Sequence, residues 1–174
     1  MEEIVIQDSA NNIDNNFLSK YYNNGLFEIT FSFKSDFKKT KIIRDYLIAI
    51  FDFLEIGMLW KNRFVLIVDE LNNNAIEYGS SSESDNKLFF KAQVSGSEVI
   101  ISIEVSDAGD GKASKNSKEM EELRINRLNK GFDNHSSIRG RGLFLIITKL
   151  VDNLYFKDNN KNGLTVGINK IISK

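Results

Sequence analysis

The sequence predicts an α+β fold, a two-layer sandwich in which helices pack on one face of a largely antiparallel sheet. Three observations support this prediction. Some segments alternate apolar and polar residues, as half-buried strands do, and others repeat apolar residues at helical spacing. The two kinds of segment follow one another without the strict strand–helix alternation of parallel folds. No internal repeat and no linker divides the 174 residues, which fit one domain.

The chain begins with a polar, turn-rich stretch over residues 8–25. We therefore expect residues 1–26 to form an N-terminal extension, which could pair with a sheet edge or with another subunit. Residues 27–33 (FEITFSF) alternate apolar and polar side chains and predict the first strand of the core domain. Asp36 is placed to cap a helix that Gly57 follows, and its apolar face comprises Ile43, Tyr46, Leu47, Ile50 and Leu54.

The remaining elements follow along a single domain that covers residues 27–174. A second helix is expected from Trp60 to Tyr78, and residues 87–107 are expected to form two antiparallel strands joined by a turn at 95–97. The stretch from Ala108 to Arg139 is glycine-rich and polar, with helical character only in SKEMEELRINRLNK. A helix over 142–154, a strand, the turn KDNNKNG and the strand LTVGINKII complete the prediction.

Composition excludes several classes of function. With 23 basic and 24 acidic residues the formal net charge is −1, so composition gives no reason to expect a nucleic-acid or membrane surface. The absence of cysteine and the single histidine, His135, argue against disulfides and against thiolate or histidine-rich metal sites. No apolar run reaches about 18 residues, and the N-terminus lacks signal-peptide features. We expect a soluble, cytoplasmic protein.

Three consecutive asparagines interrupt the second helix, in the stretch DELNNNAIEYG. Asparagine is a mediocre helix former. The core stripe of this helix is expected to comprise Phe64, Val68, Leu71, Ala75 and Tyr78, and its flank Ile67, Glu70, Asn74 and Glu77. A carboxylate and an amide one turn apart can serve an oxygen-seeking cation, or can hold and deprotonate a hydroxyl. The alternative is that this pair lies on a solvated face.

Two glycine-rich elements occur farther along the chain. In VSDAGDG, Asp107 follows an apolar strand, and Gly109 and Gly111 can bring the backbone close to a flat ligand. In RGRGLFLI, two glycines precede a helix whose free N–H groups and dipole favour phosphate. Each pattern alone also describes ordinary loops and tight turns. The second is not a Walker-type phosphate loop, because no Gly-Lys-Ser or Gly-Lys-Thr is present.

In order and in context, these three elements resemble the nucleotide-binding boxes of the GHKL superfamily (Bergerat fold), which unites gyrase, heat-shock chaperone, histidine-kinase and mismatch-repair ATPases. DELNNNAIEYG is similar to the asparagine box, VSDAGDG to the first glycine box, RGRGLFLIITKLVD to the second, and NGLTVGI to the strand that closes the site. The resemblance runs from about residue 27 to the end. The branch it resembles most is the anti-sigma-factor serine/threonine kinases, which are short stand-alone domains.

The resemblance implies a role for each box residue. Asn74 would bind, through its side-chain oxygen, the Mg²⁺ that bridges the ATP phosphates, and Glu70 would be the general base. Asp107 would accept a hydrogen bond from the adenine amino group. Gly109 and Gly111 would let the backbone pass close to the base.

Further residues are implied for the phosphates and the closing strand. Gly140 and Gly142 would offer N–H groups to the phosphates, with Arg139 and Arg141 adding positive charge. Thr165 matches a threonine near the adenine pocket.

The segment from Lys112 to Ile138 would be the ATP lid, and closing it would exclude water. His135 lies there and is expected to have no chemical role, while Asn72 and Asn73 are expected to be exposed to solvent. Tyr78 stands where the anti-sigma kinases commonly have histidine, and Lys112 where an apolar residue often follows the first glycine box. Both departures concern lid packing.

Three functions remain open at this stage. The first is an enzyme: an anti-sigma-factor-like serine/threonine kinase that phosphorylates an anti-sigma-factor antagonist (a STAS-type protein) and regulates a sigma factor by partner switching, with ATP and Mg²⁺ as cofactors. The second is a non-catalytic nucleotide-binding switch that regulates a phosphatase or sigma factor by contact. The third is an interaction module with decayed boxes. The related kinases form homodimers, so a homodimer is expected, and the helix over 36–56 is a candidate partner surface.

Overall fold

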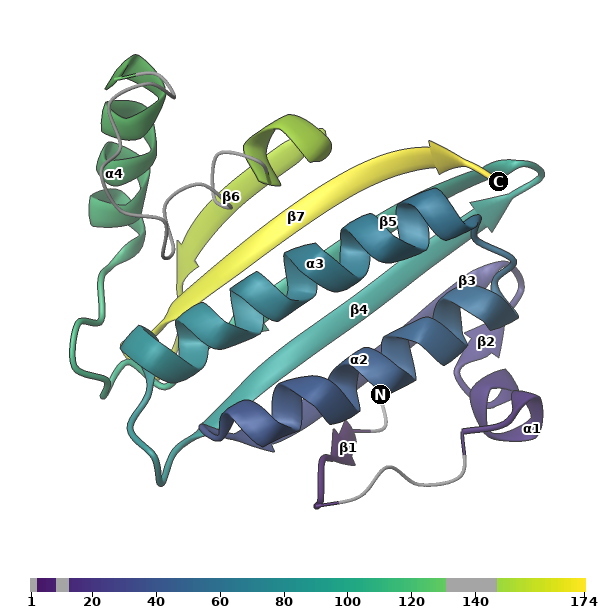
Figure 1. The fold of residues 1–174 in the computed structure, drawn as a ribbon, viewed down its shortest axis with the longest axis horizontal. Helices are drawn as coiled ribbons and strands as arrows, with labels where there is room; N and C mark the ends of the chain where they lie inside the picture. Colours follow the sequence, from purple (N-terminus) through teal and green to yellow (C-terminus); the bar gives the residue numbers. More distant parts are fainter. Residues whose placement is uncertain (1–2, 9–12, 131–146) are drawn as a thin grey trace.

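A computed structural model describes residues 3–8, 13–130 and 147–174. Within these residues, seven strands form one sheet in the order β1-β3-β4-β5-β7-β6, with β2 paired to β3 (Figure 1). The strands are β1 (Glu3–Val5), β2 (Tyr22–Asn23), β3 (Leu26–Lys34), β4 (Asp85–Ser95), β5 (Glu98–Ser106), β6 (Asn153–Asp158) and β7 (Leu164–Ser173). The β1–β3 pair is parallel and the other described pairs are antiparallel, as the predicted fold class requires.

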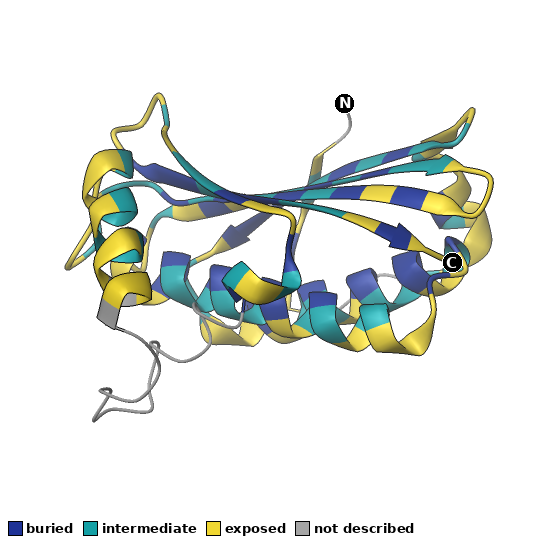
Figure 2. Cartoon of the chain, turned by 90° about the horizontal axis from the view of Figure 1, so that it is seen from above, coloured by how far each residue is buried: buried dark blue, intermediate teal, exposed yellow. Residues whose placement is uncertain are grey.

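Two long helices, α2 (Phe37–Phe53) and α3 (Met58–Asn74), cover one face of the sheet (Figures 1 and 2). The side chain of Asp36 caps α2, because its carboxylate accepts a hydrogen bond from the backbone N–H of Lys38 at 2.9 Å. Two shorter helices, α1 (Asn15–Ser19) and α4 (Ser117–Lys130), lie at opposite ends of the sheet. The α+β sandwich is therefore confirmed.

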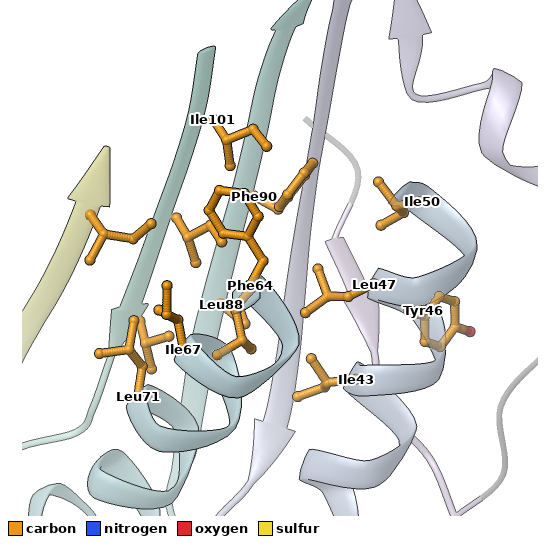
Figure 3. Close-up of a cluster of buried hydrophobic side chains, with 14 of the residues drawn as sticks. Ile43, Tyr46, Leu47, Ile50, Phe64, Ile67, Leu71, Leu88, Phe90 and Ile101 are labelled. Carbon is orange, nitrogen blue, oxygen red and sulfur yellow. The ribbon is translucent and has the colours of Figure 1, made fainter. Parts of the chain in front are cut away.

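The core fills the layer between the two helices and the sheet (Figure 3). All four apolar residues of the predicted first strand are at most 1% exposed, namely Phe27, Ile29, Phe31 and Phe33. They contact the apolar faces of α2 and α3, whose buried residues include Ile43, Leu47, Phe64 and Ile67. The period-two and helical patterns in the sequence thus correspond to the faces that are buried.

Several boundaries differ from the prediction. Gly57 does not terminate α2: the left-handed residue there is Glu55, at φ 57°, and Gly57 is the N-cap of α3. The predicted helix over 142–154 is partly outside the described residues; positions 147–150 are helical and β6 already begins at Asn153. A strand begins there because its residues pair with β7.

Residues 1–26 were expected to form an N-terminal extension, and the described part of this extension contributes to the core. Ile6 is 4% exposed and Leu18 of α1 is 1% exposed, and both belong to the main apolar cluster. β1 extends the sheet beside β3, so the extension pairs with a sheet edge of its own chain. Its apolar residues are few and irregularly spaced, so periodicity could not assign them to the core.

The second helix also changes type near its end. Residues Ala75–Gly79 form a π-helix, which places more residues in each turn than an α-helix does. Ala75 is buried as predicted, but the end of the helix leaves the predicted stripe: Tyr78, expected in the core, is 41% exposed. Ile67, expected on the flank, is buried in the core.

No helix in the described part of the chain is long and apolar enough to cross a membrane.

Candidate nucleotide-binding site

The residues of the asparagine box and of the first glycine box meet at one end of the molecule. There the C-terminal end of α3, the loop after β5 and the start of β7 come together (Figure 1). Their backbones are in close contact: a Cβ placed on Gly79 would lie 2.2 Å from Asp107 Oδ2, and one on Gly163 would lie 2.5 Å from the carbonyl oxygen of Asp107. Three segments that are far apart in the sequence thus form one site.

Glu70 and Asn74 lie one turn apart on α3, both partly buried. Asn74 Nδ2 donates to Glu70 Oε1 at 3.4 Å, and this bond does not use the amide oxygen. Burial raises the pKa of the Glu70 carboxyl, the hydrogen bond from Asn74 opposes this rise, and the negative charge of Glu77 adds to it. A carboxylate with a raised pKa is a better proton acceptor near neutral pH than an ordinary surface glutamate.

Asp107 is 9% exposed, and two backbone groups orient its carboxylate. Oδ1 accepts hydrogen bonds from the N–H of Leu164 at 2.9 Å and from the N–H of Gly109 at 3.0 Å. Burial raises the pKa of Asp107, these two bonds oppose the rise, and the nearby charge of Asp110 adds to it. The side chain is therefore a fixed, poorly solvated acceptor, as recognition of an amino group requires.

The glycines of the first box are needed for contacts within the chain itself. Gly109 has φ 76°, and a Cβ there would lie 2.4 Å from the carbonyl oxygen of Asn162. A Cβ on Gly111 would lie 2.2 Å from the carbonyl oxygen of Tyr78. Both glycines allow the loop after β5 to pack against the end of α3 and the β6–β7 turn.

Thr165 lies in the same region, but its side chain is not placed with Asp107. It is the register partner of Ser106, and the two hydroxyl oxygens are 2.7 Å apart. The β5 residues that face the helices are Val99, Ile101, Ile103 and Val105, so Ser106 and Thr165 lie on the opposite face of the sheet. The β7 residue that contacts the Asp107 carboxylate is Leu164, through its backbone N–H.

The two asparagines expected to be exposed are not. Asn72 is fully buried, and neither polar atom of its side chain has a hydrogen-bond partner among the described residues. Asn73 is partly buried and accepts a hydrogen bond from Thr40 Oγ1 on α2 at 3.3 Å. Asn72 lies between the core stripe and the side of α3 that faces α2, so the expectation for it was wrong.

Sequence reasoning missed a polar network that holds the loop after the π-helix. Ser80 Oγ donates to Asn86 Oδ1 at 2.8 Å and accepts from the N–H of Ala108 at 2.8 Å. Asp110 accepts from the N–H of Ser81 and from the hydroxyls of Ser81 and Ser84. The run of serines after Gly79 was the only sign of this network in the sequence.

The N-terminal part of the second glycine box, residues 139–146 with Arg139, Gly140, Arg141 and Gly142, lies outside the described residues, and so does His135. Its part in the site stays a prediction.

The donor atoms present fit the groups that the site was expected to hold. No described group of three or more His, Cys, Asp or Glu side chains could form a metal centre alone. Mg²⁺ is commonly held by one or two protein groups together with substrate phosphates, and Asn74 with Glu70 supplies such oxygen donors. The Asp107 carboxylate is an acceptor suited to an adenine amino group.

Comparison with family models matches residues 39–170 to the histidine kinase-like ATPase domain. Comparison with curated proteins gives no match for this chain. The matched segment includes α3, the loop after β5 and most of β7, which are the elements that form the site. The chain therefore belongs to the histidine kinase-like ATPase domain family of the GHKL superfamily, whose fold binds ATP.

Proposed function

We propose that this protein is an ATP-dependent serine/threonine kinase of the anti-sigma-factor type, which phosphorylates a STAS-type antagonist and regulates a sigma factor by partner switching. The observation that supports the proposal best is the Glu70–Asn74 pair. It places a half-buried carboxylate of raised pKa one turn from an amide suited to Mg²⁺. A domain that only bound nucleotide would not need a base at that position.

Each residue has one task in this mechanism. Asp107 accepts a hydrogen bond from the adenine amino group, which orients the nucleotide. Asn74 holds Mg²⁺, which when bound neutralises charge on the transferring phosphoryl group. Glu70 takes the proton of the acceptor serine or threonine hydroxyl, whose oxygen forms the new bond to the γ-phosphorus as the bond to ADP breaks.

The catalytic role is tested by Glu70→Gln. Glutamine keeps an oxygen that can accept from Asn74 but cannot take a proton, so we expect phosphate transfer to fall by about 10²- to 10⁴-fold. ATP affinity should stay unchanged. Transfer is measured with radiolabelled ATP and purified STAS-domain proteins of the source organism, and affinity by calorimetry. Loss of ATP affinity in this variant would contradict the assigned role.

The binding role is tested by Asp107→Asn, titrated with ATP with and without Mg²⁺. Asparagine can keep the bonds from Leu164 and Gly109 but loses the charged acceptor, so ATP binding should weaken about 10- to 100-fold. No binding by the wild type would leave only an interaction module. Binding by the wild type without transfer to any STAS protein would support the alternative, a non-catalytic nucleotide-binding switch.

The partner surface and the homodimer are part of the proposal. The solvent-facing side of α2 carries Phe37, which is 55% exposed, together with Lys41 and Asp45, so it offers an apolar anchor with charges of both signs. Charge reversal at Lys41 should weaken antagonist binding without changing ATP affinity. Sedimentation analysis measures the oligomeric state.

A further inference from the structure

The turn between β6 and β7 is bonded to the backbone of Asp107. Asn159 Nδ2 donates to the carbonyl oxygen of Asp107 at 2.8 Å. The Asn159 side-chain oxygen accepts from the N–H of Lys161 at 2.9 Å and of Gly163 at 3.0 Å, and the Asn159 N–H donates to the carbonyl oxygen of Gly163 at 2.8 Å. The turn is therefore closed on itself and is bonded to the loop that carries Asp107.

The residue before Asn159 holds the start of α4. Asp158, the last residue of β6, accepts from the N–H of Ser117 at 2.6 Å through Oδ1 and from the Ser117 hydroxyl at 2.9 Å through Oδ2. Ser117 is the first residue of α4, so the carboxylate also faces the positive end of the helix dipole. Bonds of this kind, to an ionised acceptor, are stronger than neutral ones.

The first turn of α4 is itself closed by a capping box. Asn116 N–H donates to Glu119 Oε2 at 2.9 Å, and Glu119 N–H donates to Asn116 Oδ1 at 2.9 Å. The first turn of α4 is thus closed at the same end that Asp158 holds.

Beyond this turn, α4 lies beside β6, and part of the space between the two elements is open. A groove of about 620 Å³ lies between α4 and β6, lined among others by Glu121 and Ile125 of α4 and by Leu154 and Phe156 of β6. Ile125 is 47% exposed and Leu128 is 48% exposed. Figure 1 shows the helix standing at the end of the sheet, beside β6. A helix that is bonded at one end and flanked by an open groove can pivot about that end.

We propose that Asp158 and Asn159 are positioning residues that couple the adenine-binding position at Asp107 to the orientation of α4. The inference rests on nucleotide binding at Asp107, as proposed above, and on α4 belonging to the expected ATP lid. Asn159 bonds to the Asp107 backbone and its neighbour Asp158 bonds to the α4 N-terminus, so a shift of the loop after β5 moves the helix. By linkage, releasing α4 must also weaken nucleotide binding.

The test uses the absence of native cysteine, which lets labels be placed at two chosen positions. Asn126→Cys on α4 and Asp45→Cys on α2 are both exposed and carry spin labels. We expect ADP to narrow the distance distribution between them in the otherwise unchanged protein. With Asp158→Ala the distribution should stay broad at saturating ADP, and ADP affinity should fall by about fivefold or more. Asp158→Asn keeps one acceptor oxygen and should restore part of the narrowing.

Asp152→Ala is the matched control. Asp152 precedes β6 at its other end and also accepts a backbone bond, from Ile171 at 2.7 Å, and a side-chain bond, from Lys170 at 2.5 Å. It should leave the response to ADP intact. If ADP narrows the distance distribution in Asp158→Ala as much as in the unchanged protein, the coupling is overturned. The coupling is also overturned if the distribution stays as broad in Asp152→Ala as in Asp158→Ala. Failure of the wild type to bind ADP in calorimetry would overturn the proposed function instead, whereas ADP binding with no change at α4 would overturn only the coupling.

Discussion

At the scale of single residues, Asn72 stands out among the described side chains because both of its polar atoms are buried without a hydrogen-bond partner. It is fully buried on α3 without a described hydrogen-bond partner, two positions from Glu70 and from Asn74. An unsatisfied buried amide costs about 1–3 kcal/mol. Functional regions often carry such costs.

Asn72→Leu should therefore stabilise the protein. Removing the buried amide should raise the free energy of unfolding by about 1 kcal/mol, measured by urea denaturation. Asn62→Leu, at an exposed position of the same helix, is the control for the better helix propensity of leucine. A variant at position 72 that is less stable than wild type would show that the amide is satisfied in solution.

At the scale of elements, the N-terminal extension packs against α2. Phe17 contacts the ring of Tyr46 at 6.2 Å between centroids, and Tyr22 contacts Phe53 at 5.7 Å with an edge-to-face geometry. Lys39 of α2 bonds to Asp8 at 2.6 Å. One side of α2 is covered by the sheet and another by this extension, while Phe37, Lys41 and Asp45 are exposed in the described structure.

Leu18→Ala should cost about 3 kcal/mol of unfolding free energy, because it opens a cavity in the main core. Leu66→Ala on α3, where leucine is 43% exposed, is the control and should cost about 1 kcal/mol or less. Chemical denaturation measures both. Equal, small effects would mean that the extension lies outside the cooperative unit.

At the scale of the whole molecule, the buried carboxyls of the site oppose folding at neutral pH. Burial raises the pKa of both Glu70 and Asp107, so each favours the folded state when protonated. The contribution of each carboxyl to the free energy of unfolding is fully present below its unfolded-state pKa of about 4. It is lost as pH rises through the raised pKa of the folded state. Asp152 behaves oppositely: the bond from Lys170 lowers its pKa, so its contribution is present above about 4 and is lost in acid.

Asp107→Asn should thus be more stable than wild type at pH 7, and the difference should shrink as pH falls toward about 4. Urea denaturation at the two pH values measures it. Asp152→Asn should show the opposite sign at pH 7, with a loss of about 1 kcal/mol or less because the pair is at the surface. If Asp107→Asn raises the free energy of unfolding by the same amount at both pH values, the effect does not come from ionisation of the Asp107 carboxyl.

The sequence by itself determined the fold class, the faces of the main strands and helices, and the family. Alternation in FEITFSF and the apolar spacing in α2 and α3 are local signals, and burial follows directly from them. The order of the boxes along the chain can also be read directly from the sequence, and the match to the histidine kinase-like ATPase domain agrees with it. Whether the assigned residues carry out their tasks stays a prediction.

Only the tertiary structure decided which residues meet across the chain. The burial of Asn72, the pairing of Thr165 with Ser106, the place of Leu18 in the core and the bonds of Asp158 and Asn159 all depend on partners distant in sequence. Periodicity reports the side of an element on which a residue lies, but not what the neighbouring element places there. The π-helix after Asn74 shifts that side as well, because its turn holds more residues than the α-helical pattern assumes.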